Sequence, residues 1–364
     1  MRRLLLLGGL SLALFAAPAA TVAQDDETTA KSREASDKAA RWLIKNQNKN
    51  GSWGLDQRGS SDCLTCTSIA ALALMAGGNH ERGGPDRESV EAVRAALEYV
   101  LTKAKRRPSD IAHGTTTLIQ SKLGHRVHTF FTVTFLTQAY GMRGQWVPRE
   151  HLDEMREVLT AMVTSIATTQ ESDGSWHKEA FGSLKATAMA WLALRSASSG
   201  GIEIKHAAVD KIVTFMKKSY SPTTHQFDKV YGQGGGYGGY QTIYATSSAL
   251  RVLYGMGEGQ SSEAQKGAEA LIKMLGKGGA MQSQFLSCEG EDYLCAAMMT
   301  QAMMLEGGKL WKQWFPFIRD ELIKRQSNDG TWTGTACISG KTFPTACALL
   351  TLSTPYRLLP LHEN

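Results

Sequence analysis

The chain has 364 residues, of which 42% are hydrophobic and 20% charged, and its formal net charge is +6. That length is enough for two average domains or for one large closed architecture. The basic residues are spread along the chain. Their one cluster ends at Pro108 and is typical of a solvated helix end; it comprises Lys103, Lys105, Arg106 and Arg107. We therefore expect no nucleic-acid partner.

The N-terminus has the pattern of a secretory signal peptide. Two arginines precede an apolar stretch that ends at Phe15, and small residues follow up to Ala23. The apolar stretch is shorter than the roughly 20 residues that a membrane-spanning helix needs. We expect cleavage near Ala23, which makes residues 1–23 the signal peptide and residues 24–364 an exported, periplasmic or extracellular, single domain. A signal anchor is the alternative. No long apolar run follows, so we expect no membrane span in the mature chain.

Six cysteines favour disulfide bonds in an exported protein, although the spacing does not fix their pairing. The candidates are Cys63, Cys66, Cys288, Cys295, Cys337 and Cys347. A redox or zinc role for the CxxC pair at positions 63 and 66 is the alternative. Zinc would need a second pair at similar spacing, and the other pairs are further apart.

One phrase of seven residues occurs three times, with Gln first, Gly four residues later and Trp six residues later. Its copies are Gln47, Gly51 and Trp53; Gln170, Gly174 and Trp176; and Gln326, Gly330 and Trp332. The Asn-Gly or Asp-Gly step suits a turn with positive φ, and the Gln amide can bond to unpaired backbone groups at helix ends. We interpret the phrase as a structural staple in which Trp packs between helices.

The distances between the three Trp residues correspond to two and three periods of about 50 to 60 residues each. Weaker turns are expected at the intermediate positions. They are placed around His113-Gly114, from Gly232 to Tyr240, and at Gly278-Gly279. The chain is therefore predicted to contain six repeats.

Hydrophobic periodicity predicts a pair of helices in each repeat. The first helix of each pair has a polar face and is expected at residues 31–47, 88–105, 149–169, 206–218, 262–275 and 310–326. The second is less charged and is expected at residues 63–76, 126–140, 184–196, 242–254, 293–305 and 345–353. Helices that are apolar on most faces must be buried. We predict an all-α, six-fold α/α toroid with the second set inside, closed by a C-terminal strap at 354–364. An open solenoid, which would need polar caps, is the alternative.

At the three Gln-Gly-Trp phrases the chain resembles the prenyltransferase and squalene-cyclase repeat superfamily, including its exported bacterial members. The resemblance covers nearly all of the mature chain and implies an α/α toroid with a central cavity, as in terpenoid cyclases and protein prenyltransferases. The catalytic motifs do not carry over. The acidic D-x-D-D motif of class II terpene cyclases is absent from the mature chain. Asp292-x-x-Cys295 stands in place of the close Asp-x-Cys of prenyltransferase zinc sites, and the G-C-G-E-Q motif of thioester proteins is also missing.

The long connections from outer to inner helices place all inner-helix N-termini around one mouth, where their partial positive charge favours anions. We expect ligand-binding residues there: Asp62, His113, Tyr237, Tyr244 and Tyr293. The same mouth receives Lys185, Cys63, Cys66 and Cys295. Glu291 and Asp292 are interpreted as a charge pair at a helix N-terminus.

His125 and His128 are the catalytic candidates with the clearest spacing, because residues i and i+3 share a helix face. Asp292 is the third candidate. No cofactor is predicted; zinc bound by His125, His128 and Cys295 is the alternative. The alternative is that neither histidine has a functional role, with one packed in the core and the other solvated.

Three functions are consistent with these features. The leading hypothesis is an exported ligand-binding or scaffold toroid without the catalytic motifs of the superfamily, with a small molecule, lipid or glycan at the mouth. The alternative is an enzyme, either an isoprenoid-handling transferase or cyclase or a polysaccharide lyase or hydrolase acting at the mouth. A protein-interaction scaffold would instead present an exposed apolar patch on the outer helices.

Overall fold

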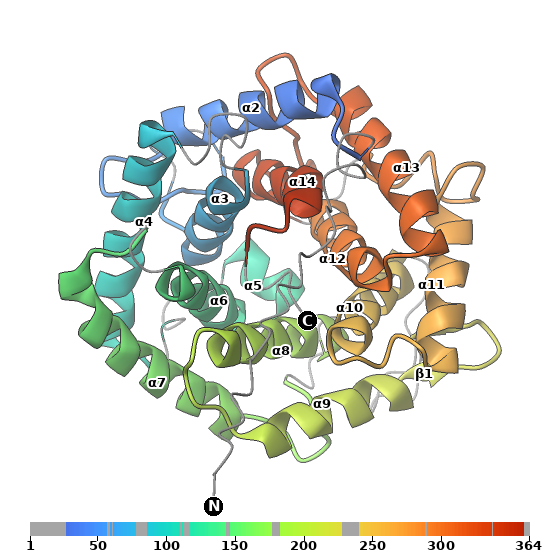
Figure 1. Ribbon diagram of the computed structural model, residues 1–364, viewed down its shortest axis with the longest axis horizontal. Coiled ribbons are helices and arrows are strands. Elements are labelled where there is room, and N and C mark those ends of the chain that lie inside the picture. The colour runs from blue at the N-terminus through green and yellow to red at the C-terminus, as the bar shows by residue number, and fades with distance from the viewer. Residues whose placement is uncertain are drawn as a thin grey trace, which may run out of the picture.

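Two concentric rings of helices form the molecule (Figure 1). The computed structural model describes residues 27–56, 59, 61–77, 86–109, 111, 117–142, 146–176, 183–227, 240–287, 290–336 and 338–359. The outer ring consists of α2 (Ala30–Lys45), α4 (Arg87–Arg106), α7 (Leu152–Thr168), α9 (His206–Lys218), α11 (Ser262–Leu275) and α13 (Lys309–Arg325). The inner ring consists of α3 (Leu64–Ala76), α6 (Val127–Gly141), α8 (Ser183–Ser199), α10 (Tyr240–Gly255), α12 (Gly290–Glu306) and α14 (Thr342–Ser353).

The predicted all-α toroid is therefore confirmed, and the predicted boundaries agree with the observed ones to within three residues. Each inner helix packs against the next around the barrel, and α14 packs against α3 to close the ring. The order of the inner ring is thus the order of the chain. An open solenoid would leave α3 and α14 apart.

Composition explains which helices lie inside. Every residue of α3 from Thr65 to Ala76 is buried, and the small side chains of this helix let its neighbours approach closely on all sides. By contrast, α4 buries only one face and begins with Asp86 as its N-cap, whose side chain accepts a hydrogen bond from the backbone of Ser89. A helix with one apolar face belongs in the outer ring, where the other face meets solvent.

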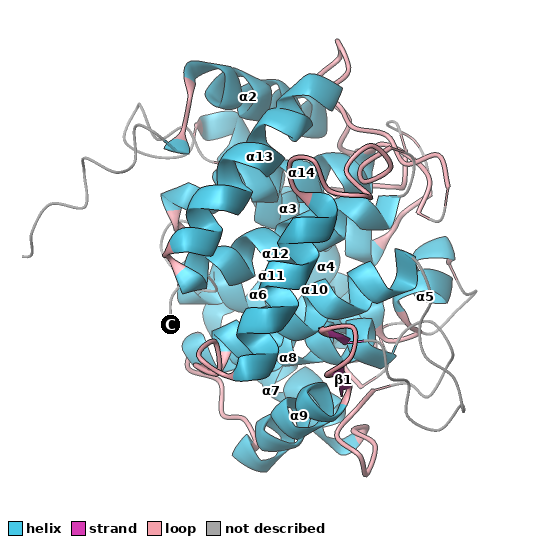
Figure 2. Ribbon diagram, turned by 90° about the vertical axis from the view of Figure 1, so that its right-hand side faces the viewer, coloured by secondary structure: helices cyan, strands magenta, loops and turns pink. Residues whose placement is uncertain are grey.

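Short elements complete the chain. The 3-10 helix η2 (Arg149–His151) replaces the first turn predicted for α7, and strands β1 (Tyr220–Ser221) and β2 (Gln226–Phe227) form an antiparallel hairpin. The helix α5 (Leu118–Leu123) was not predicted; it lies across one end of the barrel (Figure 2) and starts with a capping box between Thr117 and Gln120. At the C-terminus η3 (Thr354–Tyr356) packs against α12 and α14, and Leu359 is buried. None of the described helices is both long and apolar enough to cross a membrane.

The three Gln-Gly-Trp phrases have the same hydrogen bonds. In the second phrase, Gln170 Nε2 donates to the carbonyl of Gly174 at 3.0 Å and to that of Ala208 in α9 at 2.8 Å. The Trp176 indole donates to the carbonyl of Ile166 in α7 at 3.0 Å. The corresponding acceptors in the next outer helix are Ala92 for Gln47 and Ala35 for Gln326. Each Gln therefore joins one outer helix to the next, and Gln326 joins the last outer helix to the first.

The fourth repeat differs from the prediction. The turn that takes the place of the phrase lies at residues 221–227, before the glycine-rich segment that was predicted to form it; residues 228–239 of that segment lie outside the described residues. The backbone N–H of Phe227 donates to Thr246 Oγ1 at 3.1 Å, as that of Trp176 does to Thr187 Oγ1. His225 has φ of +56° two residues before Phe227 and so occupies the place of the glycine. Because His225 replaces the glycine and Phe227 replaces the tryptophan, the sequence pattern did not reveal this turn.

Gly174 is required for two separate reasons. Its φ is +95°, and a Cβ atom at this position would lie 2.4 Å from the carbonyl oxygen of Lys211. Gly201 has a similar φ of +81° but open space around it. We expect Gly174→Ala to lower the free energy of unfolding by at least about 2 kcal/mol more than Gly201→Ala, because only the first adds a backbone clash to the left-handed strain that both share. Chemical denaturation of the two variants measures the difference; equal losses would contradict this account.

Candidate functional site

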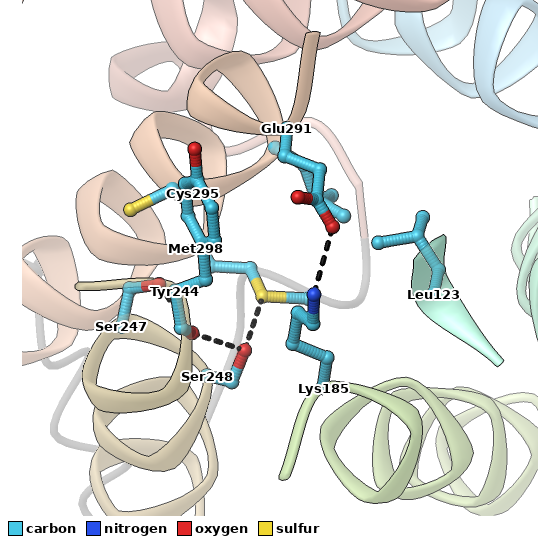
Figure 3. A pocket seen from close by; sticks show the side chains of 9 residues that line it. Leu123, Lys185, Tyr244, Ser247, Ser248, Glu291, Cys295 and Met298 are labelled. Atoms are coloured by element: carbon cyan, nitrogen blue, oxygen red, sulfur yellow. Dashed lines mark hydrogen bonds and ion pairs between the residues drawn. The ribbon is translucent and has the colours of Figure 1, made fainter. Parts of the chain in front are cut away.

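The starts of three inner helices line a cavity at the end of the barrel that α5 covers. Its interior has a free volume of only about 10 Å³, which is room for about one water molecule; about 200 Å³ is reached when the open space at its mouth is counted. Leu123 of α5 forms one wall, opposite the side chains of α12 (Figure 3). The other lining residues come from α8, α10 and α12: Lys185, Tyr244, Ser247, Ser248, Glu291, Leu294, Cys295 and Met298.

A buried ion pair crosses this cavity. Lys185 Nζ of α8 lies 2.8 Å from Glu291 Oε1 of α12, and the two residues are only 5% and 2% exposed. Gln241 Oε1 lies 3.4 Å from the same ammonium group. Glu291 Oε2 is buried and has no hydrogen-bond partner within the described part of the chain. One oxygen of Glu291 is therefore neutralised by Lys185, and the other lacks a donor in the described structure.

The neighbouring acid, Asp292, is bound differently. Its Oδ1 accepts a hydrogen bond from the Tyr244 hydroxyl at 2.9 Å, and its Oδ2 accepts one from the backbone N–H of Leu286 at 2.9 Å. Leu286 has φ of +63°, a conformation that costs energy for a side chain of this kind and that the bond to Asp292 helps to hold. Burial, with the nearby carboxylates of Asp292 and Glu291, raises the pKa of Tyr244 well above its usual value. Tyr244 is thus a protonated donor that Asp292 orients.

The two histidines of the predicted pair do not share a helix face. His128 is buried in the first turn of α6, and its Nδ1 lies 2.7 Å from Thr65 Oγ1 of α3. His125 is exposed in the turn before α6, where its carbonyl accepts a bond from Gln120. The i, i+3 spacing was interpreted as helical, although His125 precedes both the predicted helix at 126–140 and the observed α6. Burial, with His125 nearby, lowers the pKa of His128 to about 4.

The other predicted binding residues fall in separate places. Asp62 is exposed and accepts hydrogen bonds from Asn50, Ser52 and Tyr99, so it belongs to the first repeat turn. Burial alone would raise the pKa of Asp62, but these bonds hold it below its usual value. Tyr293 is buried, with its hydroxyl 3.5 Å from the carbonyl of Leu286. His113 and Tyr237 lie outside the described residues.

The cysteines differ from the expectation of disulfides. Cys63, Cys66, Cys295 and Cys347 are buried, unbridged thiols, each on or at the start of an inner helix. Burial raises the pKa of Cys295 well above its usual value. Cys288 and Cys337 lie outside the described residues.

The zinc alternative lacks a ligand set in the part of the chain that is described. There, no group of three or more His, Cys, Asp and Glu side chains is arranged to hold a metal ion. His125 is exposed, His128 is engaged by Thr65, and Cys295 lies within α12 beside the cavity. The three proposed ligands therefore do not converge.

The ion pair between Lys185 and Glu291 was not predicted from the sequence. The two residues are 106 positions apart, and Glu291 was interpreted only as a charge at a helix N-terminus. A usable indication was present, since each is a charged residue at the start of a helix that is otherwise almost uncharged. In a toroid such residues point to the same mouth.

Comparison with solved structures places this fold beside carbohydrate-active toroids. The GH76A α-1,6-mannanase from Salegentibacter sp. HEL1_6 superposes with a TM-score of 0.64 over 90% of this chain and 99% of its own, at 11% sequence identity. An inactive variant of the same enzyme with two consecutive aspartates replaced by asparagine, in complex with α-1,6-mannotriose, gives a TM-score of 0.62 at 11% identity, with the same shares of both chains covered. No protein-family model and no curated protein sequence matches the chain. The likeness shows that the fold is an α/α toroid of the kind used by these mannanases.

The type II terpene cyclase MstE from Scytonema is a more distant neighbour. It gives a TM-score of 0.35 at 13% identity, over 90% of this chain and 98% of its own. That value is too low to support an isoprenoid function.

The depressed pKa of His128 makes stability depend on pH. Between about pH 6.5 and pH 4 the unfolded chain binds a proton at this residue and the folded chain does not. The free energy of unfolding therefore decreases as pH falls through this range, by up to about 1.4 kcal/mol per pH unit from His128. We expect His128→Gln to be less sensitive to this pH range than the parent in thermal unfolding scans. His206→Gln, at an exposed position at the start of α9, is the control and should keep the parent's pH dependence.

Breaking the buried ion pair should be far more costly than breaking an exposed one. Lys185→Met leaves Glu291 buried without a counter-charge, which costs about 3 to 5 kcal/mol. Lys217→Met removes an equally short pair with Glu258 at 2.8 Å whose side chains are 35% and 39% exposed, and should cost less than about 1 kcal/mol. Adding Glu291→Gln to Lys185→Met should recover much of the loss. Denaturation midpoints test the order; similar values for the two single variants would refute it.

Proposed function

We propose that this protein is a glycoside hydrolase that cleaves a neutral polysaccharide at the barrel mouth covered by α5. The observation that carries the proposal is Glu291, a buried carboxyl group that lines the cavity and has one oxygen unpartnered in the described residues. Hydrolysis of a glycosidic bond requires a carboxyl group that exchanges a proton with the sugar oxygen or with water. Glu291 is the residue in the cavity suited to that role.

The consecutive acids have separate tasks in this proposal. Asp292 is engaged by Tyr244 and by the backbone of Leu286, so it positions the tyrosine and does not exchange protons with the substrate. Lys185 balances the charge of Glu291 and fixes its orientation. The fold likeness to α-1,6-mannanases, whose inactive variants lack two consecutive aspartates, supports a glycan substrate.

The charges of the cavity favour hydrolysis over elimination. Polysaccharide lyases act on uronic acids, which are anionic, yet the cavity and its support hold two carboxyl groups against one ammonium group. This balance outweighs the weak positive field of the helix N-termini that suggested anionic ligands. A noncatalytic binding toroid would also use the unpartnered carboxyl oxygen, as an acceptor for its ligand. Release of reducing ends separates a hydrolase from such a binding protein.

Two further points belong to the same proposal. We place the protein outside the cytoplasm, on the strength of the N-terminal signal-peptide pattern, where polymeric glycans are accessible. We also assign the chain to the prenyltransferase and squalene-cyclase repeat superfamily by its Gln-Gly-Trp turns, with the isoprenoid chemistry of that superfamily replaced.

Incubation of the mature chain with a panel of polysaccharides tests the proposal. We expect release of reducing ends from α-mannan or another neutral glycan and none from polyuronates. Glu291→Gln should lower kcat by about 10² or more, the usual contribution of a general acid or base. Glu157→Gln, on the exposed face of α7, is the matched control and should leave kcat unchanged. Full activity in Glu291→Gln, or cleavage confined to polyuronates, would overturn the proposal.

A further inference from the structure

Cys63 and Cys66 are placed as a reactive thiol pair at the start of α3. Cys63 is the N-cap of this helix, and its Sγ accepts a hydrogen bond from the backbone N–H of Cys66 at 3.3 Å. A cysteine sulfur at a helix N-terminus is stabilised as a thiolate by the N–H groups that point at it. The second thiol follows three residues later, a spacing that puts two residues on the same side of a helix. The two sulfurs therefore meet over the first turn.

The surroundings of the two thiols differ. A hydrogen bond from the Cys66 thiol, with bonds from the backbone N–H groups of Cys66 and Thr65, lowers the pKa of Cys63 although burial opposes this shift. Burial raises the pKa of Cys66 well above its usual value. Cys63 is 4% exposed and Cys66 is 0% exposed, so only Cys63 presents any surface to a reagent. Cys63 is thus suited to be the attacking sulfur and Cys66 the resolving one.

The backbone around the pair is fixed by hydrogen bonds. The N–H of Cys63 donates to the carbonyl of Trp53 at 3.0 Å, and the carbonyl of Cys63 accepts from Thr67 Oγ1 at 2.8 Å. Thr65, between the two cysteines, has its Oγ1 2.7 Å from His128 Nδ1. Residues i and i+3 of a helix have Cα atoms about 5 Å apart, within the range of about 4.4 to 6.8 Å that a disulfide needs. A bond between the two sulfurs therefore requires no movement of α3.

We propose that Cys63 and Cys66 are a redox pair that exchanges disulfide bonds with a small disulfide compound of the class of oxidised glutathione. The Cys63 thiolate attacks one sulfur of that compound, and the other sulfur leaves as a thiolate. Cys66 then loses its proton and attacks the Cys63 sulfur, which releases the second thiolate. Two cysteine thiols are oxidised to one disulfide, and one external disulfide is reduced to two thiols. The two protons lost by the cysteines end on the thiols released.

A purely structural bridge would favour a different pairing. A bond between Cys63 and Cys66 closes a loop of only four residues, so it removes less chain entropy than a bridge between distant residues. Cys347 of α14 is a neighbouring thiol of Cys66, and a bridge there would join the last inner helix to the first. The bond from the Cys66 N–H to the Cys63 sulfur favours the short bridge, which is the reversible kind. This activity does not depend on the proposed glycan hydrolysis, and its readout is separate.

Exchange with oxidised glutathione tests the proposal. The reduced, folded mature chain is incubated with oxidised glutathione near neutral pH, quenched with acid, alkylated and digested with trypsin for mass spectrometry. Both cysteines fall in the tryptic peptide 59–82, which loses two hydrogens when their disulfide forms. We expect this disulfide to form at least about tenfold faster than glutathione adds to Cys295, a buried thiol inside α12 whose pKa burial raises. Excess reduced glutathione should reverse it.

Three variants assign the roles of the two sulfurs. Cys66→Ser lacks the resolving thiol, so Cys63 should keep glutathione as a stable mixed disulfide. Cys63→Ser retains a good N-cap residue and should take up no glutathione at Cys66. Cys347→Ser is the matched control and should leave oxidation of peptide 59–82 unchanged. The assignment is wrong if the folded parent stays reduced while the urea-unfolded chain is oxidised, or if Cys66 pairs with Cys347. The parent alone decides this, whether or not the variants fold.

Discussion

The glutamine amide that joins successive outer helices is the contact on which the closed ring depends. Gln326 of the last repeat donates to Ala35 of α2 at 2.8 Å, across 291 positions of sequence. The carbonyl of Ala35 lies within the first turns of α2. The same Gln326 amide also donates to the carbonyl of Gly330 in its own turn. A buried donor left without an acceptor costs about 1 to 3 kcal/mol, so the amide fixes the spacing of neighbouring helices as well as linking them.

Ring closure creates the site. Because every inner helix runs back from an outer helix through a long connection, the inner helices all begin at one end of the barrel. Lys185 and Glu291 lie on α8 and α12, which α10 separates in the ring. The two side chains meet at the cavity (Figure 3), where Lys185 Nζ also lies 5.5 Å from the centre of the Tyr244 ring. In an open array of the same repeats this pair would have no common interior in which to form.

The sequence predicted the scaffold far better than the site, for a physical reason. Helical periodicity and the Gln-Gly-Trp turns are local patterns, so the two rings and their boundaries follow from short windows of residues. The pairing of Lys185 with Glu291 depends on which inner-helix starts converge, and that depends on ring closure and on side-chain direction. The error for His125 and His128 has the same origin. An i, i+3 spacing has meaning only inside a helix, and the unpredicted α5 places His125 in a turn.

The consecutive acids show how one helix turn supplies two kinds of carboxyl group. Adjacent residues on a helix point about 100° apart, so Glu291 faces the cavity while Asp292 faces α10 and the strained backbone at Leu286. The second acid is saturated with donors and stabilises the wall; the first is left with an unpartnered oxygen in the described structure. Burial of such an oxygen costs free energy that folding alone does not require. Packing of the two closed rings offsets that cost. A helix cap would direct both carboxyl groups to backbone N–H groups. The arrangement of Glu291 and Asp292 is instead typical of a site for a bound molecule.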